Sequence, residues 1–173
     1  EGLMSDERSF EAALSLFQYR LYKTMGKAKL REVALGGSAT DIERAFYDAL
    51  QKADLEKLMA CWADEDEIVC VHPGGVRLVG ALEIRKSFES IFSGGSMHVN
   101  VLSVRKVESL TSAMHNVIEQ IQVSLGQDTQ EAYVIATNVY QQTPQGWRMV
   151  LHHASPGHPD SLQAELDVPS VLH

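Results

Sequence analysis

The chain has 173 residues, 45% of them hydrophobic, and a formal net charge of −8 at pH 7. This length and composition suit one globular domain with a buried core, whereas general binding to nucleic acids or anionic membranes requires a basic face that an acidic chain lacks. No apolar run reaches 18 residues, so we expect no transmembrane helix. No secretory signal is recognisable at the start, and we expect a cytoplasmic protein.

The first 37 residues differ from the rest of the chain. Four apolar residues recur there at the spacing of an amphipathic helix: Phe10, Leu14, Phe17 and Leu21. Basic side chains follow from Arg20 to Arg31 with no acidic residue among them. Two interpretations stay open: an arm that docks on an acidic partner or second subunit, or a helix that packs on its own domain. We therefore divide the chain into an extension (1–37), a domain (38–157) and a tail (158–173).

The domain opens with helices. The sequence from Thr40 to Glu43 has the spacing of a capping box, in which the threonine oxygen and the glutamate each satisfy a free amide. Asp54 is placed to cap a second, short helix. A third apolar pattern with helical spacing runs from Ala81 to Phe92 and ends at Gly94.

Strands follow a different pattern. Two short ones are predicted at 67–72 and 76–79, joined by a turn at 73–75. Four long strands are predicted at 97–107, 111–125, 129–142 and 146–154, with tight polar breaks between them. Consecutive strands with short turns form an antiparallel meander, and helices followed by such a sheet predict an α+β fold.

Three motifs, in this order, give the chain a family resemblance. They are Ala60-Cys61-Trp62, then Val71-His72-Pro73-Gly74-Gly75 continuing to Ser87, then 136–140 followed by 147–155. Together they resemble the SnoaL-like branch of the nuclear transport factor 2-like, ketosteroid isomerase-like superfamily over about 40–156. The last motif is also similar to the end of the calcium/calmodulin-dependent kinase II association domain.

The resemblance implies a cone: a curved antiparallel sheet wrapped around N-terminal helices, a cystatin-like α+β roll with a pocket inside. Members of the superfamily commonly pair as homodimers through the outer sheet surface. Their functions range over isomerases, dehydratases, polyketide cyclases, ligand binders and assembly domains. The fold therefore does not decide the function.

Glu119 is the first candidate for a catalytic group. In the strand 111–125 it shares a face with Val117 and Ile121, and a carboxylate among apolar neighbours needs a partner or a raised pKa. This makes Glu119 a candidate general base. The alternative is that this face belongs to a dimer surface or rim, with Glu119 paired to an arginine.

The adjacent histidines His152 and His153 form the second candidate. Neighbours on a strand point to opposite faces, so only one of them can enter a pocket, and the pair cannot chelate one metal. We take His153 as a second catalytic candidate and His152 as a ligand-binding one. A structural hydrogen bond is the alternative for either ring.

Further ligand-binding candidates come from the motifs and from the predicted pocket. They are Trp62, His72, Arg77, Tyr133 and Asn138. Arg77 offers a planar fork for a carboxylate or phosphate, and Tyr133 offers a donor to a developing oxyanion. Each has an ordinary structural alternative: a core position for the aromatic rings, and a surface ion pair for the arginine.

Two functional hypotheses follow. The first is a cofactor-independent isomerase, dehydratase or cyclase that uses general acid/base chemistry on a small, partly apolar carbonyl compound. The second is a non-catalytic ligand-binding or oligomerisation domain. No metal or cofactor is expected under either, because Cys61 and Cys70 lack metal or redox spacing and no phosphate-cradling or nucleophile motif occurs. The partners we expect are a second copy of the chain and a small-molecule ligand.

Overall fold

The computed structural model describes residues 37–94, 97–125 and 128–160, which belong to one compact unit spanning Leu35–His173. The amphipathic helix expected within 1–37 and most of the expected tail lie outside these residues. In the described part of the chain, no helix is both long and apolar enough to cross a membrane.

Helix α2 spans Ala39–Gln51, and its cap differs from the expected one. The N-cap is Ser38, whose Oγ accepts a hydrogen bond from the Asp41 amide at 3.2 Å and donates to the Asp41 carboxylate at 2.7 Å. The capping box expected from Thr40 to Glu43 is therefore wrong by two residues. The physical reason is that Glu43 lies about half a turn beyond Asp41, where its side chain faces the sheet instead of the helix end.

The other two helices begin where the sequence predicts. Asp54 caps α3 (Leu55–Ala60) by accepting from the Lys57 amide at 3.0 Å. Helix α4 spans Ala81–Ser93 after Gly80, whose φ of +83° suits a residue without a Cβ. Gly94 is the C-cap of α4.

Six strands form one mixed sheet in the order β2-β1-β6-β5-β4-β3. They are β1 (Val69–Val71), β2 (Arg77–Val79), β3 (Met97–Glu108), β4 (Ser112–Leu125), β5 (Asp128–Thr143) and β6 (Gly146–Pro156). The last four form the predicted antiparallel meander, whereas β1 runs parallel to β6. The predicted α+β class is confirmed, with a sheet that curves but does not close.

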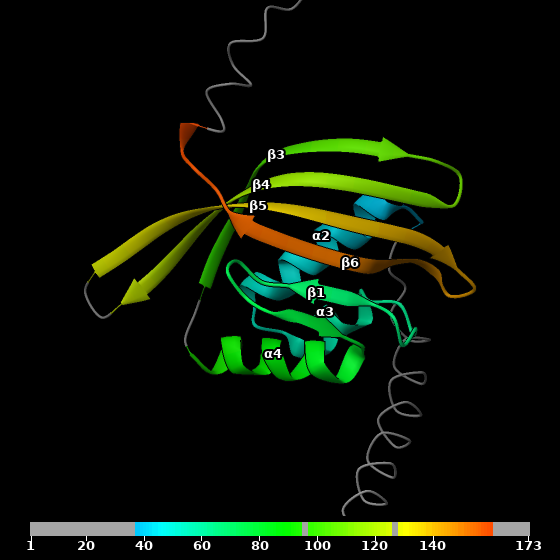
Figure 1. Cartoon of the computed structure of the whole chain (residues 1–173), viewed down its shortest axis with the longest axis horizontal. Helices are drawn as coiled ribbons and strands as arrows, with labels where there is room; N and C mark the ends of the chain where they lie inside the picture. Colours follow the sequence, from blue (N-terminus) through cyan, green and yellow to red (C-terminus); the bar gives the residue numbers. More distant parts are fainter. Residues whose placement is uncertain (1–36, 95–96, 126–127, 161–173) are drawn as a thin grey trace, which may run out of the picture. The chain divides into compact units, whose positions relative to one another are not determined.

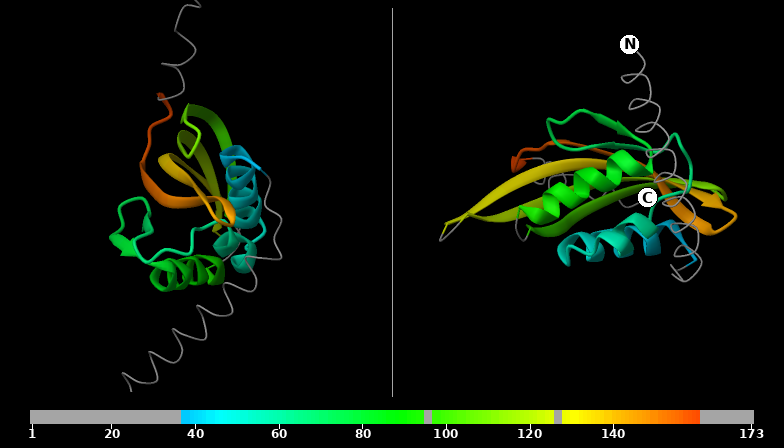
Figure 2. Two further views of the ribbon diagram at one scale, coloured as in Figure 1. Left: turned by 90° about the vertical axis from the view of Figure 1, so that its right-hand side faces the viewer. Right: turned by 90° about the horizontal axis from the view of Figure 1, so that it is seen from below.

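Helix α2 lies across one face of the long strands, and we call this the inner face (Figures 1 and 2). The core packs there, with Ile42 and Phe46 of α2 against Val117 of β4 and Tyr140 of β5, all fully buried. Helix α4 packs beside α3 and β2. A bulge in β3 between Val101 and Ser103 interrupts the ladder where the strands curve.

Candidate functional site

A row of polar side chains crosses the inner face from strand to strand. His115 of β4 pairs in register with Asn138 of β5, Asn138 with His152 of β6, and His152 with Cys70 of β1. All four are buried, and both His115 and Asn138 are completely inaccessible. Because directly opposite residues lie about 5 Å apart, this register places four groups with titratable or hydrogen-bonding atoms side by side.

Glu119 lies on the same face of β4, four residues beyond His115. Its side chain is 4% exposed, and its hydrogen-bond partner is Tyr47 of α2, whose hydroxyl donates to Oε1 at 2.5 Å. No lysine or arginine is paired with this carboxylate among the described residues. The expected alternative, an outward carboxylate paired to an arginine, is therefore wrong on the geometry.

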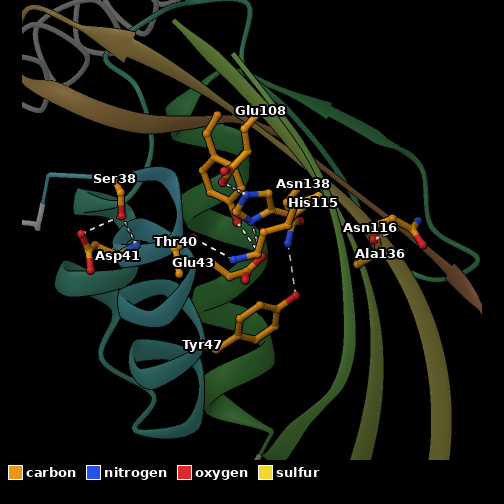
Figure 3. A network of polar contacts seen from close by, with 12 residues as sticks. Ser38, Thr40, Asp41, Glu43, Tyr47, Glu108, His115, Asn116, Ala136 and Asn138 are labelled. Carbon is orange, nitrogen blue, oxygen red and sulfur yellow. Dashed lines mark hydrogen bonds and ion pairs between the residues drawn. The ribbon is translucent and has the colours of Figure 1, made fainter. Parts of the chain in front are cut away.

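Tyr47 connects Glu119 to the polar row, and Figure 3 shows its contact with Asn138. The amide Nδ2 of Asn138 donates to the Tyr47 oxygen at 3.2 Å, and Oδ1 of Asn138 lies 2.7 Å from Nδ1 of His152. A carbonyl oxygen only accepts, so the His152 ring carries its proton on Nδ1 in this arrangement. Four residues of α2, β4, β5 and β6 thus form one continuous chain of hydrogen bonds.

Burial sets the protonation of the two ends of this chain. Desolvation raises the pKa of Glu119 to about 7; the Tyr47 hydrogen bond opposes the shift and the nearby Glu43 charge adds to it. Desolvation also lowers the pKa of His152 to about 3, and His72 and His153 contribute in the same direction. Near neutral pH, Glu119 is therefore divided between acid and carboxylate, whereas His152 is a neutral ring.

A second polar cluster lies beside the first. His115 places Nδ1 2.8 Å from Oε2 of Glu43 and Nε2 3.1 Å from Oε1 of Glu108, and the Tyr140 hydroxyl donates to the same Glu43 oxygen at 3.5 Å. Glu43 projects from α2 toward the sheet, as Tyr47 does one turn later (Figure 3). With a carboxylate oxygen near each ring nitrogen, the His115 side chain ties α2, β3 and β4 together.

His72 lies at the other end of the polar row. Its Nε2 is 2.8 Å from Oγ of Ser87 in α4 and 3.8 Å from Sγ of Cys70, and its ring stacks edge-on against Phe88 at 5.0 Å. Desolvation lowers the pKa of His72. Its ring centroid is 6.5 Å from that of His152, so a neutral imidazole borders the hydrogen-bond chain.

A surface depression of about 370 Å³ lies where α2 meets β3. It is lined by Thr40, Glu43, Arg44, Tyr47, Asp48, Gln51 and Val101. Tyr47 and Glu43 therefore link the depression to the two buried clusters, although Glu119 itself does not line it. The deeper pocket expected inside the cone stays a prediction.

The remaining candidates from the sequence lie apart from the hydrogen-bond chain that links Glu119 to His152. His153 is exposed on the outer face, Tyr133 is half-buried on the outer face, in register with Gln120, and Arg77 is exposed on the face of β2 opposite Leu78. The physical reason is strand alternation, because each of them is next in sequence to a residue whose side chain points inward. These three side chains therefore lie away from the hydrogen-bond chain, and the catalytic role expected of His153 and the ligand-binding roles expected of Arg77 and Tyr133 stay predictions.

Trp62 lies inside but in the core. It is 1% exposed and stacks edge-on with Phe46, and its indole Nε1 has no hydrogen-bond partner within the described ranges. In those ranges, moreover, no group of three or more histidine, cysteine or acidic side chains is arranged to hold a metal ion.

Sequence reasoning missed the contribution of α2. Tyr47 and Glu43 are four residues apart, so they share a helix face, and that face also carries the apolar stripe of Ile42 and Phe46. Two polar side chains within an apolar stripe are the signal that would have identified them. The sequence does not show which residue each of them contacts, because Glu119 and His115 follow more than 70 residues later.

Comparisons with known proteins identify the family and support the fold. Residues 40–159 match the family model described as a SnoaL-like domain. A search of curated proteins found no significant match. Solved structures that match include a candidate calcium/calmodulin-dependent protein kinase type II association domain from Thiobacillus denitrificans, with 32% identity over 72% of this chain and 98% of that chain and a TM-score of 0.65.

Two further solved structures illustrate the range of similar proteins. A candidate dehydratase of the NTF2-like family from Streptomyces avermitilis has 29% identity over 67% of this chain and 91% of that chain, with a TM-score of 0.62. A ketosteroid isomerase-like protein from Erwinia carotovora has 19% identity over 73% of this chain and 98% of that chain, with a TM-score of 0.58, and supports the fold alone.

Proposed function

The chain belongs to the SnoaL-like domain family, and we propose that it is a cofactor-independent enzyme that moves a proton on a small, partly apolar carbonyl or hydroxy-carbonyl compound. The observation that carries this proposal is the Glu119–Tyr47 pair: a carboxylate buried on the inner face, whose hydrogen-bond partner is a phenol 2.5 Å away. The similarity to a candidate dehydratase from Streptomyces avermitilis supports the same class of reaction.

Glu119 acts as the general base. A carboxyl group at the surface is too weak a base to remove a proton from carbon efficiently, whereas burial raises the pKa of Glu119 to about 7, close to the pH at which a base works best. The base takes a proton from the carbon next to the carbonyl, and the electron pair of the broken C–H bond moves to the carbonyl oxygen. The protonated Glu119 then returns the proton, to another carbon of the enolate in an isomerase, or to the hydroxyl group that leaves as water in a dehydratase.

Three neighbouring groups support the base. Tyr47 holds one carboxylate oxygen, which leaves the other free for the substrate. His152, with its proton on Nδ1, presents Nε2 as an acceptor for a substrate hydroxyl, and the nearby His72 borders the same space. The ligand therefore brings hydrogen-bond donors of its own and an apolar body that fits beside Phe46 and Phe88.

Proton exchange tests the proposal without knowledge of the natural substrate. A panel of small cyclic and branched ketones, enones and β-hydroxyketones is incubated with the protein in D₂O, and deuterium incorporation is followed by proton NMR. We expect catalysed exchange that the Glu119→Gln variant reduces by about 10²-fold or more. Glu131→Gln, the same substitution at an exposed position, is the control. Equal exchange by the wild type and Glu119→Gln would exclude Glu119 as the base.

The second candidate is an assembly domain that acts by pairing with itself. The 32% identity to a candidate kinase association domain favours it, as do apolar side chains on the outer face near the β3–β4 turn. Val107 is 67% exposed opposite Met114, and Leu110 in the turn is 93% exposed. We propose a homodimer through this region. Native mass spectrometry at micromolar concentration tests it: a monomer contradicts it, and Val107→Lys should convert a dimer to a monomer.

We also propose that the protein works in the cytoplasm. Both of its cysteines, Cys61 and Cys70, are free thiols buried in the domain, which suits a reducing compartment. Fractionation of cells that express the chain with an epitope tag tests this proposal. Recovery of the tagged chain in a secreted fraction would contradict it.

A further inference from the structure

We propose that the chain from His152 through Asn138 and Tyr47 to Glu119 has two fully hydrogen-bonded arrangements of opposite direction, and that the protonation of Glu119 selects between them. Asn138 and His152 are then positioning residues that act on the base through Tyr47. This inference rests on the proposed function for the role of Glu119 as a base. The hydrogen-bond chain itself rests only on the interatomic distances and burial of its four side chains.

The first arrangement is the one already described. Nδ1–H of His152 donates to Oδ1 of Asn138, Nδ2–H of Asn138 donates to the Tyr47 oxygen, and the Tyr47 hydroxyl donates to Oε1 of Glu119. Every donor points toward Glu119. Hydrogen bonds to an ionised acceptor are about twice as strong as neutral ones, so this direction favours the carboxylate.

The second arrangement reverses every donor. A protonated Glu119 donates to the Tyr47 oxygen, the Tyr47 hydroxyl donates to Oδ1 of Asn138, and Nδ2–H of Asn138 donates to an unprotonated Nδ1 of His152. The proton of the neutral His152 ring then lies on Nε2. The carboxamide of Asn138 turns by half a rotation, and because its oxygen and nitrogen are nearly equal in size, the heavy atoms keep their places.

Mixed arrangements are costly because the chain is buried. The most accessible of its four side chains, His152, is only 6% exposed, so a donor or acceptor without a partner is not compensated by water. An unsatisfied buried group costs about 1–3 kcal/mol, or about 5- to 150-fold in population. Glu119, Tyr47, Asn138 and His152 therefore change together, and one proton at Glu119 changes the tautomer of a histidine three hydrogen bonds away.

This coupling would give the site two working states. With Glu119 ionised, a base stands at one end and Nε2 of His152 is an acceptor at the other. After Glu119 has taken a proton from the substrate, Nε2–H of His152 is a donor, able to hold a substrate oxygen that has gained charge. No net proton crosses the chain, because His152 stays neutral in both states.

Other titratable groups border the chain and must be followed with it. Glu43 on α2 and Tyr140 on β5 act on the Glu119 and Tyr47 end, whereas His72, just after β1, and His153 on β6 act on the His152 end. The measured signal must therefore be assigned to His152 specifically and not to a neighbouring histidine. Nitrogen chemical shifts then distinguish the two neutral tautomers from each other and from imidazolium.

The test is a pH titration of the wild-type protein by NMR, with nitrogen-15 in the histidine rings and carbon-13 in the glutamate carboxyls. Because the pKa of Glu119 is about 7, we expect the Nε2–H tautomer of His152 below about pH 6 and the Nδ1–H tautomer above about pH 8. The tautomer change and the Glu119 carboxyl should share one midpoint. A single His152 tautomer throughout the Glu119 titration overturns the inference, as does an imidazolium in this range.

Variants locate the coupling. Tyr47→Phe removes the middle hydroxyl, so the His152 tautomer should stop following Glu119, and the Glu119 midpoint should rise by about one pH unit as its donor is lost. Tyr133→Phe removes a hydroxyl from the outer face of the same sheet, away from the hydrogen-bond chain, and the coupling should remain. Retained coupling in Tyr47→Phe would contradict the assigned path. If that variant fails to fold, the wild-type titration still decides.

The inference and the proposed function can fail separately. The titration needs no substrate, so a shared midpoint supports the chain even if no ketone undergoes exchange. Conversely, exchange that depends on Glu119 without any change in the His152 tautomer leaves the base in place and removes the coupling.

Discussion

The carboxylate of Glu43 and the ring of His115 lie 2.8 Å apart at the centre of the fold, although 72 residues separate them in the chain. The other ring nitrogen of His115 meets Glu108, so one histidine connects α2, β4 and the end of β3. The ring is completely buried. It holds α2 against the inner face, and Tyr47 reaches Glu119 only from a helix held in that position.

Replacing His115 should therefore destabilise the domain. His115→Gln cannot keep both the Glu43 and the Glu108 contacts of the buried ring, and leaving a buried polar group without a partner costs about 1–3 kcal/mol. Chemical denaturation measures the free energy of unfolding, with His98→Gln at an exposed position of β3 as the control. A loss below about 0.5 kcal/mol would show that the contact contributes little.

The two candidate caps of α2 can be separated by mutation. Ser38→Ala should lower the free energy of unfolding by about 1 kcal/mol, because the Asp41 amide loses its partner. Thr40→Ala should have a smaller effect, since its hydroxyl accepts from Lys106 near the surface and caps no amide. Thermal or chemical unfolding of the two variants measures this difference. A larger effect of Thr40→Ala would restore the cap expected from the sequence.

Glu119 should make stability depend on pH in an unusual direction. Its folded-state pKa of about 7 exceeds the ordinary value of 4.5, so the folded protein binds the proton more tightly than the unfolded chain. The contribution of Glu119 is thus greatest below about pH 4.5 and is lost as the pH rises through 7, by up to about 3 kcal/mol. His152, with its lowered pKa of about 3, opposes this trend below pH 6.5.

The variant Glu119→Gln isolates the pH-dependent contribution of Glu119 to the free energy of unfolding. Relative to the wild type, its free energy of unfolding should rise steadily between about pH 4.5 and 7 and level off above that range. Urea denaturation at half-unit pH steps gives the difference directly, and Glu131→Gln is the surface control. A difference that is constant over this range would mean that Glu119 is not held as a buried acid.

Catalysed proton exchange should follow the ionisation of the same residue. If Glu119 is the base, the rate should fall about tenfold for each pH unit below its pKa of about 7 and reach a plateau above it. His152 should add no second change between about pH 5 and 9, because it remains neutral there. A pH–rate profile on an active ketone measures this. A flat profile across pH 7 would point to a different base.

The two thiols should be unreactive in the folded protein. Burial raises the pKa of both Cys61 and Cys70 to about 12, and only the thiolate attacks a disulfide reagent. With Ellman's reagent at pH 8, we expect almost no reaction of native protein and two thiols per chain in guanidinium chloride. Rapid reaction of one native thiol would reveal an opening near that strand or helix.

Much of the fold could be predicted from local pattern. Alternation and turn residues located the four long strands and their antiparallel order, and the Asp54 cap and Gly94 marked helix ends where the structure has them. Strand parity also separates His152 from His153. These features depend on neighbours in the chain, and short-range geometry is the same wherever the segment lies.

The sequence by itself thus determined the α+β class, the family, and an apolar strand face shared by Glu119. Only the tertiary structure decided what that carboxylate meets. Tyr47 reaches it from a helix 72 residues earlier, and Asn138 and His152 join through strand register. The physical reason is that a hydrogen bond depends on two groups meeting in space. A single strand specifies which way a side chain points, and the packing of α2 on the sheet specifies its partner.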